Sequence, residues 1–187
     1  MMKKALCIIT LCLVTVCCFG QKKDSDRFPY PNVPIDETTG LVTYKEVIQQ
    51  ENATPQELFD RALAWAKKYY KTTGEVIKVS DREKGLLQLR SSVRIYVVKD
   101  DGTKIMKNIV YYNMKIECRP GRYRYTITDF NERATAAAPI EVWLNTEKPT
   151  WEIGQYGYLN QIDEQILSLI ESLEEGMNPT AVVEDEW

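Results

Sequence analysis

Three consecutive segments with alternating apolar residues constrain this chain most tightly. They span residues 87–97, 110–116 and 123–127, and in each every second residue faces the same way. Strand side chains point alternately to the two faces of a sheet, so each segment is typical of a strand with one buried face. Turn signals at Asp101-Gly102 and Pro120-Gly121 separate them. The sequence therefore predicts an antiparallel meander with one apolar face. The predicted inward residues are Leu87, Leu89, Val93, Ile95, Val97, Val110, Tyr112, Met114, Ile116, Tyr123, Tyr125 and Ile127, with Ser91 the single polar member.

An amphipathic helix is predicted to precede the meander. Thr54 and Glu57 have the spacing of a capping box, and Pro55 suits the first helical turn. Gly74 is expected to end the element. The apolar stripe recurs at steps of three and four residues and comprises Leu58, Ala62, Trp65, Ala66 and Tyr69.

A second helix is predicted over residues 158–175, with Gly176 as its stop. Its stripe comprises Leu159, Ile162, Ile166, Leu169 and Leu173, and Leu167 and Ile170 widen it. Pairing with another chain as a short coiled coil is the alternative. Because only about two heptads are present, we expect the stripe to pack on the chain's own sheet.

Further strands are predicted over residues 40–49, where Val42, Tyr44 and Ile48 share one side, over residues 75–80, and as an edge strand over residues 140–144. The resulting fold class is α+β: a two-layer sandwich of a curved antiparallel sheet of about five strands, in the order β-α-β-β-β-β-α, backed by two helices. We expect a single domain over residues 39–176, preceded by a polar, proline-containing leader over residues 21–38 and followed by an acidic tail over residues 177–187.

The first twenty residues have the layout of a secretory signal peptide. Lys3 and Lys4 precede an apolar run over residues 5–19, and cleavage is expected before Gln21. The protein is therefore expected in the periplasm or cell envelope. Lipidation at Cys17 or Cys18 is the alternative and the one route by which we expect membrane attachment, although neither cysteine follows the small residue that lipidation normally requires.

Composition excludes several function classes. The chain has no His, which excludes Ser-His-Asp and Cys-His catalysis and imidazole metal ligands. Four of its five cysteines lie in the predicted signal peptide, so only Cys118 remains, and its place in the alternation predicts a buried core residue. Loss of residues 1–20 removes two lysines and no acidic residue, which changes the net charge from −3 to −5. We therefore expect no nucleic acid partner.

Three segments carry a family resemblance. Residues 33–47, 57–65 and 121–130 are similar to an uncharacterised family of secreted Bacteroidetes proteins, domain of unknown function 4468, with a TATA-binding-protein-like (TBP-like) fold. The resemblance covers residues 33–130. It implies a curved antiparallel sheet backed by helices, and it implies no activity and no catalytic residues.

The outward face of the predicted sheet carries interleaved cations and aromatic rings, a combination suited to a glycan, an anionic polymer or a protein loop. The alternative is a solvated face whose arginines pair with acids such as Glu117. The candidate binding residues are Arg90, Arg94, Tyr96, Tyr111, Lys115, Arg122 and Arg124.

A glycosidase-type pair of carboxylates is the main catalytic alternative. Asp129, Glu132, Glu141 and Glu152 lie near predicted strand ends or loops, and no spacing selects two of them. The segments Asp24-Ser25-Asp26 and Asp100-Asp101-Gly102 come closest to calcium loops, but both lack the remaining ligands.

The sequence thus favours an exported, non-catalytic binding or accessory module that acts as a monomer on an envelope protein or glycan, without cofactor or metal. A small hydrolase acting on envelope glycans and a structural envelope component are the alternatives. A pocket that holds two carboxylates about 5 to 10 Å apart would favour the hydrolase. An Arg/Tyr face without such a pocket would favour binding.

Overall fold

The computed structural model describes residues 28–99 and 101–179. Predictions for the signal peptide, for lipidation at Cys17 or Cys18, for the segment 24–26, for Asp100 and for the tail from residue 180 lie outside the described residues. The elements in chain order are β1 (Tyr44–Gln49), α2 (Pro55–Tyr69), α3 (Thr73–Val76), β2 (Ile77–Asp81), β3 (Leu86–Val98), β4 (Lys104–Arg119), β5 (Arg122–Glu132), the 3-10 helix η1 (Ile140–Leu144) and α4 (Gly154–Met177).

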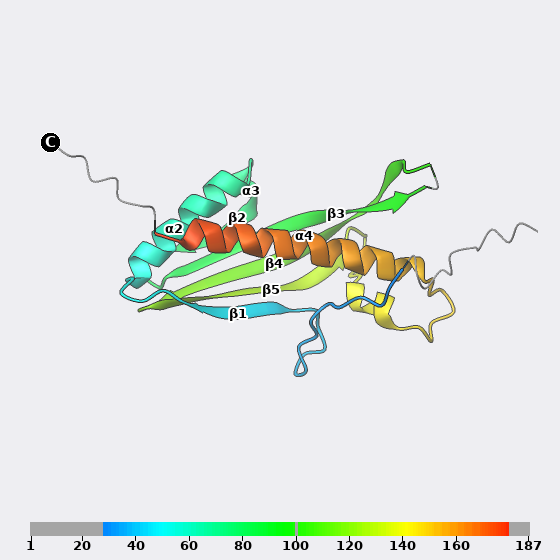
Figure 1. Cartoon of the computed structure of the whole chain (residues 1–187), viewed down its shortest axis with the longest axis horizontal. Coiled ribbons are helices and arrows are strands. Elements are labelled where there is room, and N and C mark those ends of the chain that lie inside the picture. The colour runs from blue at the N-terminus through cyan, green and yellow to red at the C-terminus, as the bar shows by residue number, and fades with distance from the viewer. Residues whose placement is uncertain (1–27, 100, 180–187) are drawn as a thin grey trace, which may run out of the picture.

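The five strands form one antiparallel sheet in the order β1-β5-β4-β3-β2. The meander β3-β4-β5 is its centre, and β1 returns to pair with β5 at one edge. Helices α2 and α4 lie on the same face of the sheet, with α4 running lengthwise across it (Figure 1). This arrangement confirms the predicted two-layer α+β fold, with α3 and η1 as short additions.

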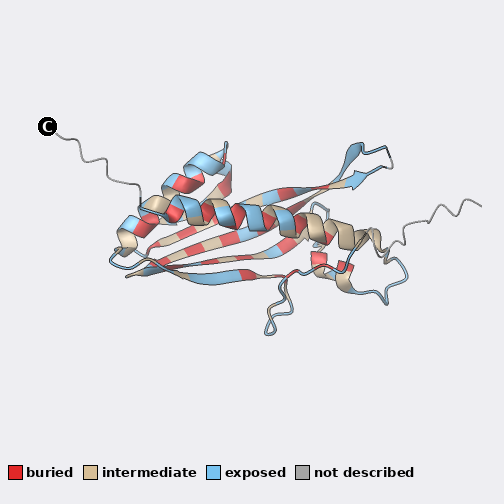
Figure 2. Ribbon diagram, viewed as in Figure 1, coloured by how far each residue is buried: buried red, intermediate tan, exposed pale blue. Residues whose placement is uncertain are grey.

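The core lies between the sheet and the two long helices (Figure 2). Both predicted stripes contribute to it: Ala62 and Ala66 of α2 are fully buried, as are Ile162 and Ile166 of α4. The stripe of α4 therefore packs within the chain, as predicted, and Leu167 on the opposite side is 52% exposed. In the part of the chain that the structure describes, no helix is long and apolar enough to cross a membrane.

Helix α2 begins as predicted and ends earlier than predicted. The Thr54 hydroxyl accepts a hydrogen bond from the Glu57 N–H at 3.2 Å, and a Glu57 carboxylate oxygen accepts from the Thr54 N–H at 2.7 Å, which completes the capping box. The expected end at Gly74 is wrong, because the helix stops at Tyr69 and the next residue, Tyr70, turns into the core. Its hydroxyl meets that of buried Tyr112 at 3.2 Å.

The predicted inward position of Tyr69 is also wrong. Its side chain is 43% exposed, since Tyr70 takes the buried place. Residues 73–76 form α3, so the strand predicted over residues 75–80 is Ile77–Asp81 instead.

Helix α4 is longer than predicted at both ends. It starts at Gly154 and continues through Gly176 to Met177, so the expected stop at Gly176 is wrong. The reason is tertiary: a Cβ at position 176 would come within 2.7 Å of the Trp65 ring, so glycine lets α4 approach α2 closely.

Residues 140–144 form η1 and not the predicted edge strand. Ile140 and Trp143 are both buried, a spacing of three that suits a 3-10 turn, whereas the expected strand would have a spacing of two. Two further corrections concern strand ends. Regular pairing of β1 starts at Tyr44, four residues later than expected, and Val97 is 38% exposed near the tip of the β3–β4 hairpin.

Side chains of α4 close part of the free edge of β3. Strand β2 pairs only with residues 86–89 of β3. Beyond them, the side-chain amide of Gln165 accepts from the Arg94 N–H at 3.4 Å and donates to the Arg94 carbonyl at 3.1 Å. Gln161 does the same with Tyr96, at 2.9 Å in both bonds. The two amides thus imitate a neighbouring strand.

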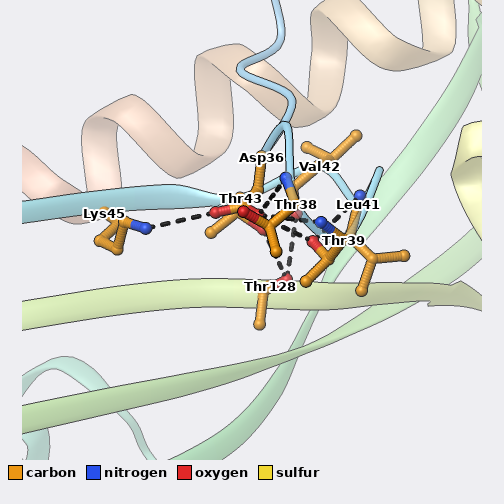
Figure 3. Close-up of polar contacts among 8 residues, drawn as sticks. All are labelled: Asp36, Thr38, Thr39, Leu41, Val42, Thr43, Lys45 and Thr128. Carbon is orange, nitrogen blue, oxygen red and sulfur yellow. Dashed lines mark hydrogen bonds and ion pairs between the residues drawn. The ribbon is translucent and has the colours of Figure 1, made fainter.

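A turn centred on Asp36 fixes the start of β1 (Figure 3). One Asp36 oxygen accepts from the N–H groups of Thr38 and Thr39 at 3.1 and 3.0 Å, and Lys45 pairs with the other oxygen at 3.2 Å. These bonds, the Thr39 N–H first, lower the pKa of Asp36. Within the expected leader, Val33 is buried in the core.

Candidate functional site

The sheet face opposite the helices carries three adjoining hollows along β4, which we call the arginine, central and carboxylate hollows. Five of the seven predicted binding residues line them: Arg122 and Arg124 the first, Lys115 the second, Arg90 and Tyr111 the third. The structure places the other two, Arg94 and Tyr96, further along β3, where the α4 glutamines hold their backbones.

The arginine hollow lies at the β4–β5 hairpin and has a volume of about 230 Å³. Its lining residues are Val47, Glu117, Arg119, Arg122, Tyr123 and Arg124. Strong pairing sets its geometry: the Arg124 Nε and Nη2 donate to one Glu117 oxygen at 3.0 and 2.6 Å. The Lys115 ammonium lies 3.2 Å from the same oxygen.

Glu117 is therefore already shared between two cations. Partial burial acts to raise its pKa, but the hydrogen bonds from Arg124 and Lys115 outweigh burial and hold the pKa below its usual value. The Glu117 carboxylate therefore stays ionised at neutral pH and is already bound by Arg124 and Lys115. The predicted alternative of arginines paired with acids thus holds for Arg124.

The central hollow has a volume of about 390 Å³. Its polar lining residues are Lys78, Gln88, Asn113, Lys115, Thr126 and Thr128, and it is also lined by Leu89 and Met114, whose side chains are buried on the covered face. Thr128 also ties this region to the Asp36 turn, because its hydroxyl donates to the Val42 carbonyl at 3.2 Å (Figure 3). Amides and hydroxyls are the groups that polar, uncharged ligands need.

The carboxylate hollow, of about 480 Å³, lies where a bulge interrupts the pairing of β4 with β5. Arg90 stacks over the Tyr111 ring, with its guanidinium carbon 5.6 Å from the ring centroid. Asp129 and Glu132, two of the four candidate carboxylates, line this hollow together with Asn113. The structure therefore brings part of the predicted binding face and part of the predicted acid set into one place.

Asp129 has a strained backbone. Its φ is +62°, a left-handed conformation that non-glycine residues adopt at a cost of about 1 kcal/mol or more. The Asn113 amide donates to one of its carboxylate oxygens at 2.6 Å, and the Asn131 amide donates to the other at 3.2 Å. Glu132 is held in the same way by the Asn108 amide at 2.7 Å. Strain retained beside a hollow is typical of a functional position.

The other two candidate carboxylates lie elsewhere. Glu141 accepts from the Val42 N–H at 2.8 Å and so supports the chain before β1. Glu152 lies in the loop before α4 and lines none of the three hollows. Asp101 bonds the Thr103 N–H at 2.9 Å, which is a turn contact. Among residues 28–99 and 101–179, no group of three or more acidic or thiol side chains could hold a metal ion.

Cys118 lies on the helix-covered face of β4, as its place in the alternation predicts. It is a free thiol and 5% exposed. Burial raises its pKa to about 12, which keeps it in the unreactive thiol form.

Sequence reasoning missed three charged residues that line the hollows: Lys78, Arg119 and Arg133. Arg119 continues the outward alternation of Tyr111, Lys115 and Glu117, so the period of two could have identified it. Arg133 lies in the irregular segment after β5, where no periodicity was available.

The comparisons with known proteins agree with this fold. A family model described as "Domain of unknown function (DUF4468) with TBP-like fold" matches residues 44–133. A TBP-like protein from Parabacteroides distasonis is 21% identical with a TM-score of 0.61, and the match covers 78% of this chain and 96% of that one. A DUF4468 family protein from Bacteroides ovatus is 18% identical with a TM-score of 0.63, over 86% of this chain and 99% of that one.

At these identities the solved structures establish the fold alone. No curated protein shows significant sequence similarity to the chain. The family model, the shared fold and the predicted resemblance nevertheless agree over the same strands. Over residues 44–133, the chain matches the model of the DUF4468 family with a TBP-like fold.

Proposed function

We propose that this protein is an exported, non-catalytic binding module of the cell envelope whose open sheet face binds an extended glycan. The observation that carries the proposal is the continuity of the three hollows. The central and carboxylate hollows share Asn113, and the Lys115–Glu117 ion pair bridges the central and arginine hollows. Export rests on the signal-peptide layout of residues 1–20.

The dimensions of the face suit a chain-like ligand. From Tyr111 to Arg119 the outward residues of β4 span eight steps, about 27 Å at the usual rise of a strand. Along this length the outward residues of β4 are Tyr111, Asn113, Lys115, Glu117 and Arg119, so aromatic, amide and charged groups follow one another. A compact substrate would use one hollow, and an extended polymer can contact all three.

Retention on envelope glycan fractions tests the proposal. The double variant Arg90→Ser/Asn113→Ala removes contacts at the carboxylate and central hollows, and we expect retention to fall about tenfold or more. The matched control Lys67→Ser/Lys68→Ser changes two exposed residues on α2, on the other side of the molecule, and should bind like the wild type. Absence of wild-type binding, or equal retention of both variants, would contradict the proposal.

A glycan hydrolase is the second candidate, because Asp129 and Glu132 line the same hollow. Both side chains accept amide hydrogen bonds and Asp129 is exposed, whereas a proton-donating acid usually lies in an apolar environment. We therefore favour binding. Reducing-sugar release from envelope glycans decides between the two candidates: release that disappears in Asp129→Asn or Glu132→Gln would establish the hydrolase.

A further inference from the structure

We propose that the arginine hollow is a subsite for an anionic group (a sulfate, phosphate or carboxylate) carried by the glycan. This inference rests on the proposed function and specifies the class of its ligand. Neither the resemblance nor the family description assigns a ligand to this end of the sheet.

Two arginines of the arginine hollow lie directly opposite each other. Arg119 and Arg122 are register partners across the β4–β5 hairpin, and both are exposed. Like charges in facing positions destabilise a strand pair. Among the described residues neither arginine has an ion pair, so the protein itself supplies no anion to offset the repulsion.

The arginine hollow also has a local excess of positive charge. Arg119, Arg122, Arg124 and Lys115 surround a single acid, Glu117, whose contacted oxygen already receives both Arg124 and Lys115. The remaining cations face solvent in a chain whose net charge is −3. A local excess opposite in sign to the overall charge attracts an anion to this place and not to the rest of the surface.

The side chains of the arginine hollow also fit an anionic group chemically. Guanidinium groups present paired donors whose geometry matches the oxygens of carboxylate, phosphate and sulfate. The hollow of about 230 Å³ has room for such a group, and the side chain of Val47, 47% exposed, offers an apolar contact beside it. Arg119 and Arg122 can thus donate to the anion while Arg124 remains with Glu117.

The surroundings favour a polysaccharide over a membrane or a nucleic acid as the carrier. The arginine hollow continues into the central hollow, whose polar lining residues Gln88, Asn113, Thr126 and Thr128 suit sugar hydroxyls. Val47 is the one exposed large apolar side chain that lines the arginine hollow, too little for insertion into lipid. Among the residues that line the three hollows, Tyr111 is the one aromatic side chain that is not buried, and its ring is covered by Arg90.

The test compares charged and neutral forms of the same sugars. Calorimetry with the purified protein would use oligogalacturonate against its methyl ester, and dextran sulfate against dextran. We expect binding of the charged forms that is at least tenfold tighter than that of the neutral forms and that weakens with added salt. Arg119→Gln/Arg122→Gln should abolish this preference, whereas the charge-matched control Lys67→Gln/Lys68→Gln should retain it.

Several results would overturn the inference. Equal affinity for charged and neutral sugars, or an unchanged preference in Arg119→Gln/Arg122→Gln, removes the anionic subsite but leaves glycan binding intact. Failure of every sugar to bind overturns the proposed function as well. Equal or tighter binding to phosphatidylglycerol vesicles, or to a single-stranded oligothymidine, assigns the arginines to a different class of partner.

Discussion

The two faces of the sheet differ in burial and polarity. On the face covered by α2 and α4, the central strands place side chains such as Leu87, Ile116 and Ile127 in full burial. On the open face, most of the neighbouring residues in sequence are polar or charged, and they line three hollows. The covered face contributes most of the stability of the fold, and the open face contributes less and can therefore vary with function.

The comparison also shows where the protein accepts a stability cost. On the covered side there is no buried charged residue in the described part of the chain, although the Tyr123 hydroxyl is buried without a hydrogen-bond partner. The open face holds the facing pair Arg119 and Arg122 and the left-handed backbone of Asp129. The facing arginines and the left-handed Asp129 both lie at hollows of the open face, which is consistent with the proposed binding role of this face.

The largest difference in stability between the two faces is expected when two neighbouring residues of β4 are each replaced by alanine. Ile116→Ala should lower the free energy of unfolding by about 3 kcal/mol, because it removes a fully buried side chain and leaves a cavity. Lys115→Ala, on the open face, should change it by about 0.5 kcal/mol or less. Urea denaturation measures both, and similar losses in the two variants would refute the division into faces.

The Cys118 thiol, on the covered face, should make the free energy of unfolding depend on pH. Burial raises the pKa of Cys118 from 9.0 to about 12, so its contribution is fully present below pH 9 and is lost as the pH rises toward 12. The loss should be at most about 1.4 kcal/mol per pH unit. Denaturation of wild type and Cys118→Ala between pH 8 and about pH 11 isolates this contribution, since the other groups titrate alike in both.

Parallel curves for the two proteins would show that the Cys118 thiol is not kept neutral by burial.

The α4 glutamines that bond the free backbone edge of β3 should protect this edge from pairing with other molecules. Gln161→Ala/Gln165→Ala leaves the backbones of Arg94 and Tyr96 without these partners, at a cost of about 2 kcal/mol for the two positions. The open edge should also promote concentration-dependent association. Glu164→Ala, an exposed neighbour on α4, is the control for denaturation and sedimentation measurements, and equal behaviour of the two would disprove edge protection.

The smallest predicted effect is a gain in stability, whereas the other substitutions lower stability. Arg119→Gln/Arg122→Gln should raise the free energy of unfolding by about 0.5 kcal/mol at low salt, because it removes a facing pair of like charges. The gain should shrink as salt screens the wild-type repulsion. A loss of stability would mean that these arginines have a structural role, and the argument for an anionic subsite would lose its first support.

The sheet and the stripes of both helices could be predicted because burial imposes a period on the sequence. Their ends could not. Tyr70 replaces Tyr69 in the core, and Gly176 continues a helix because Trp65 packs against it. Both outcomes depend on contacts between distant segments, which local patterns do not contain.

The candidate site, too, could be predicted only in part from local sequence patterns. The period of two placed Arg90, Tyr111 and Lys115 on one face. It did not predict that a bulge between β4 and β5 brings Asp129 to Asn113, since pairing register depends on both strands together. Nor did it separate Arg122, which has no ion pair among the described residues, from Arg124, which is held by Glu117.

The central claim is that the open face binds an anionic glycan through its unpaired arginines. Side-chain NMR signals of the arginine Nε–H groups report on it directly during a titration with oligogalacturonate. We predict shifts for Arg119 and Arg122, with little change for Arg82, which pairs with Asp60 on another surface. Shifts confined to Arg82 and Arg61, or no shifts at saturating ligand, would contradict the account.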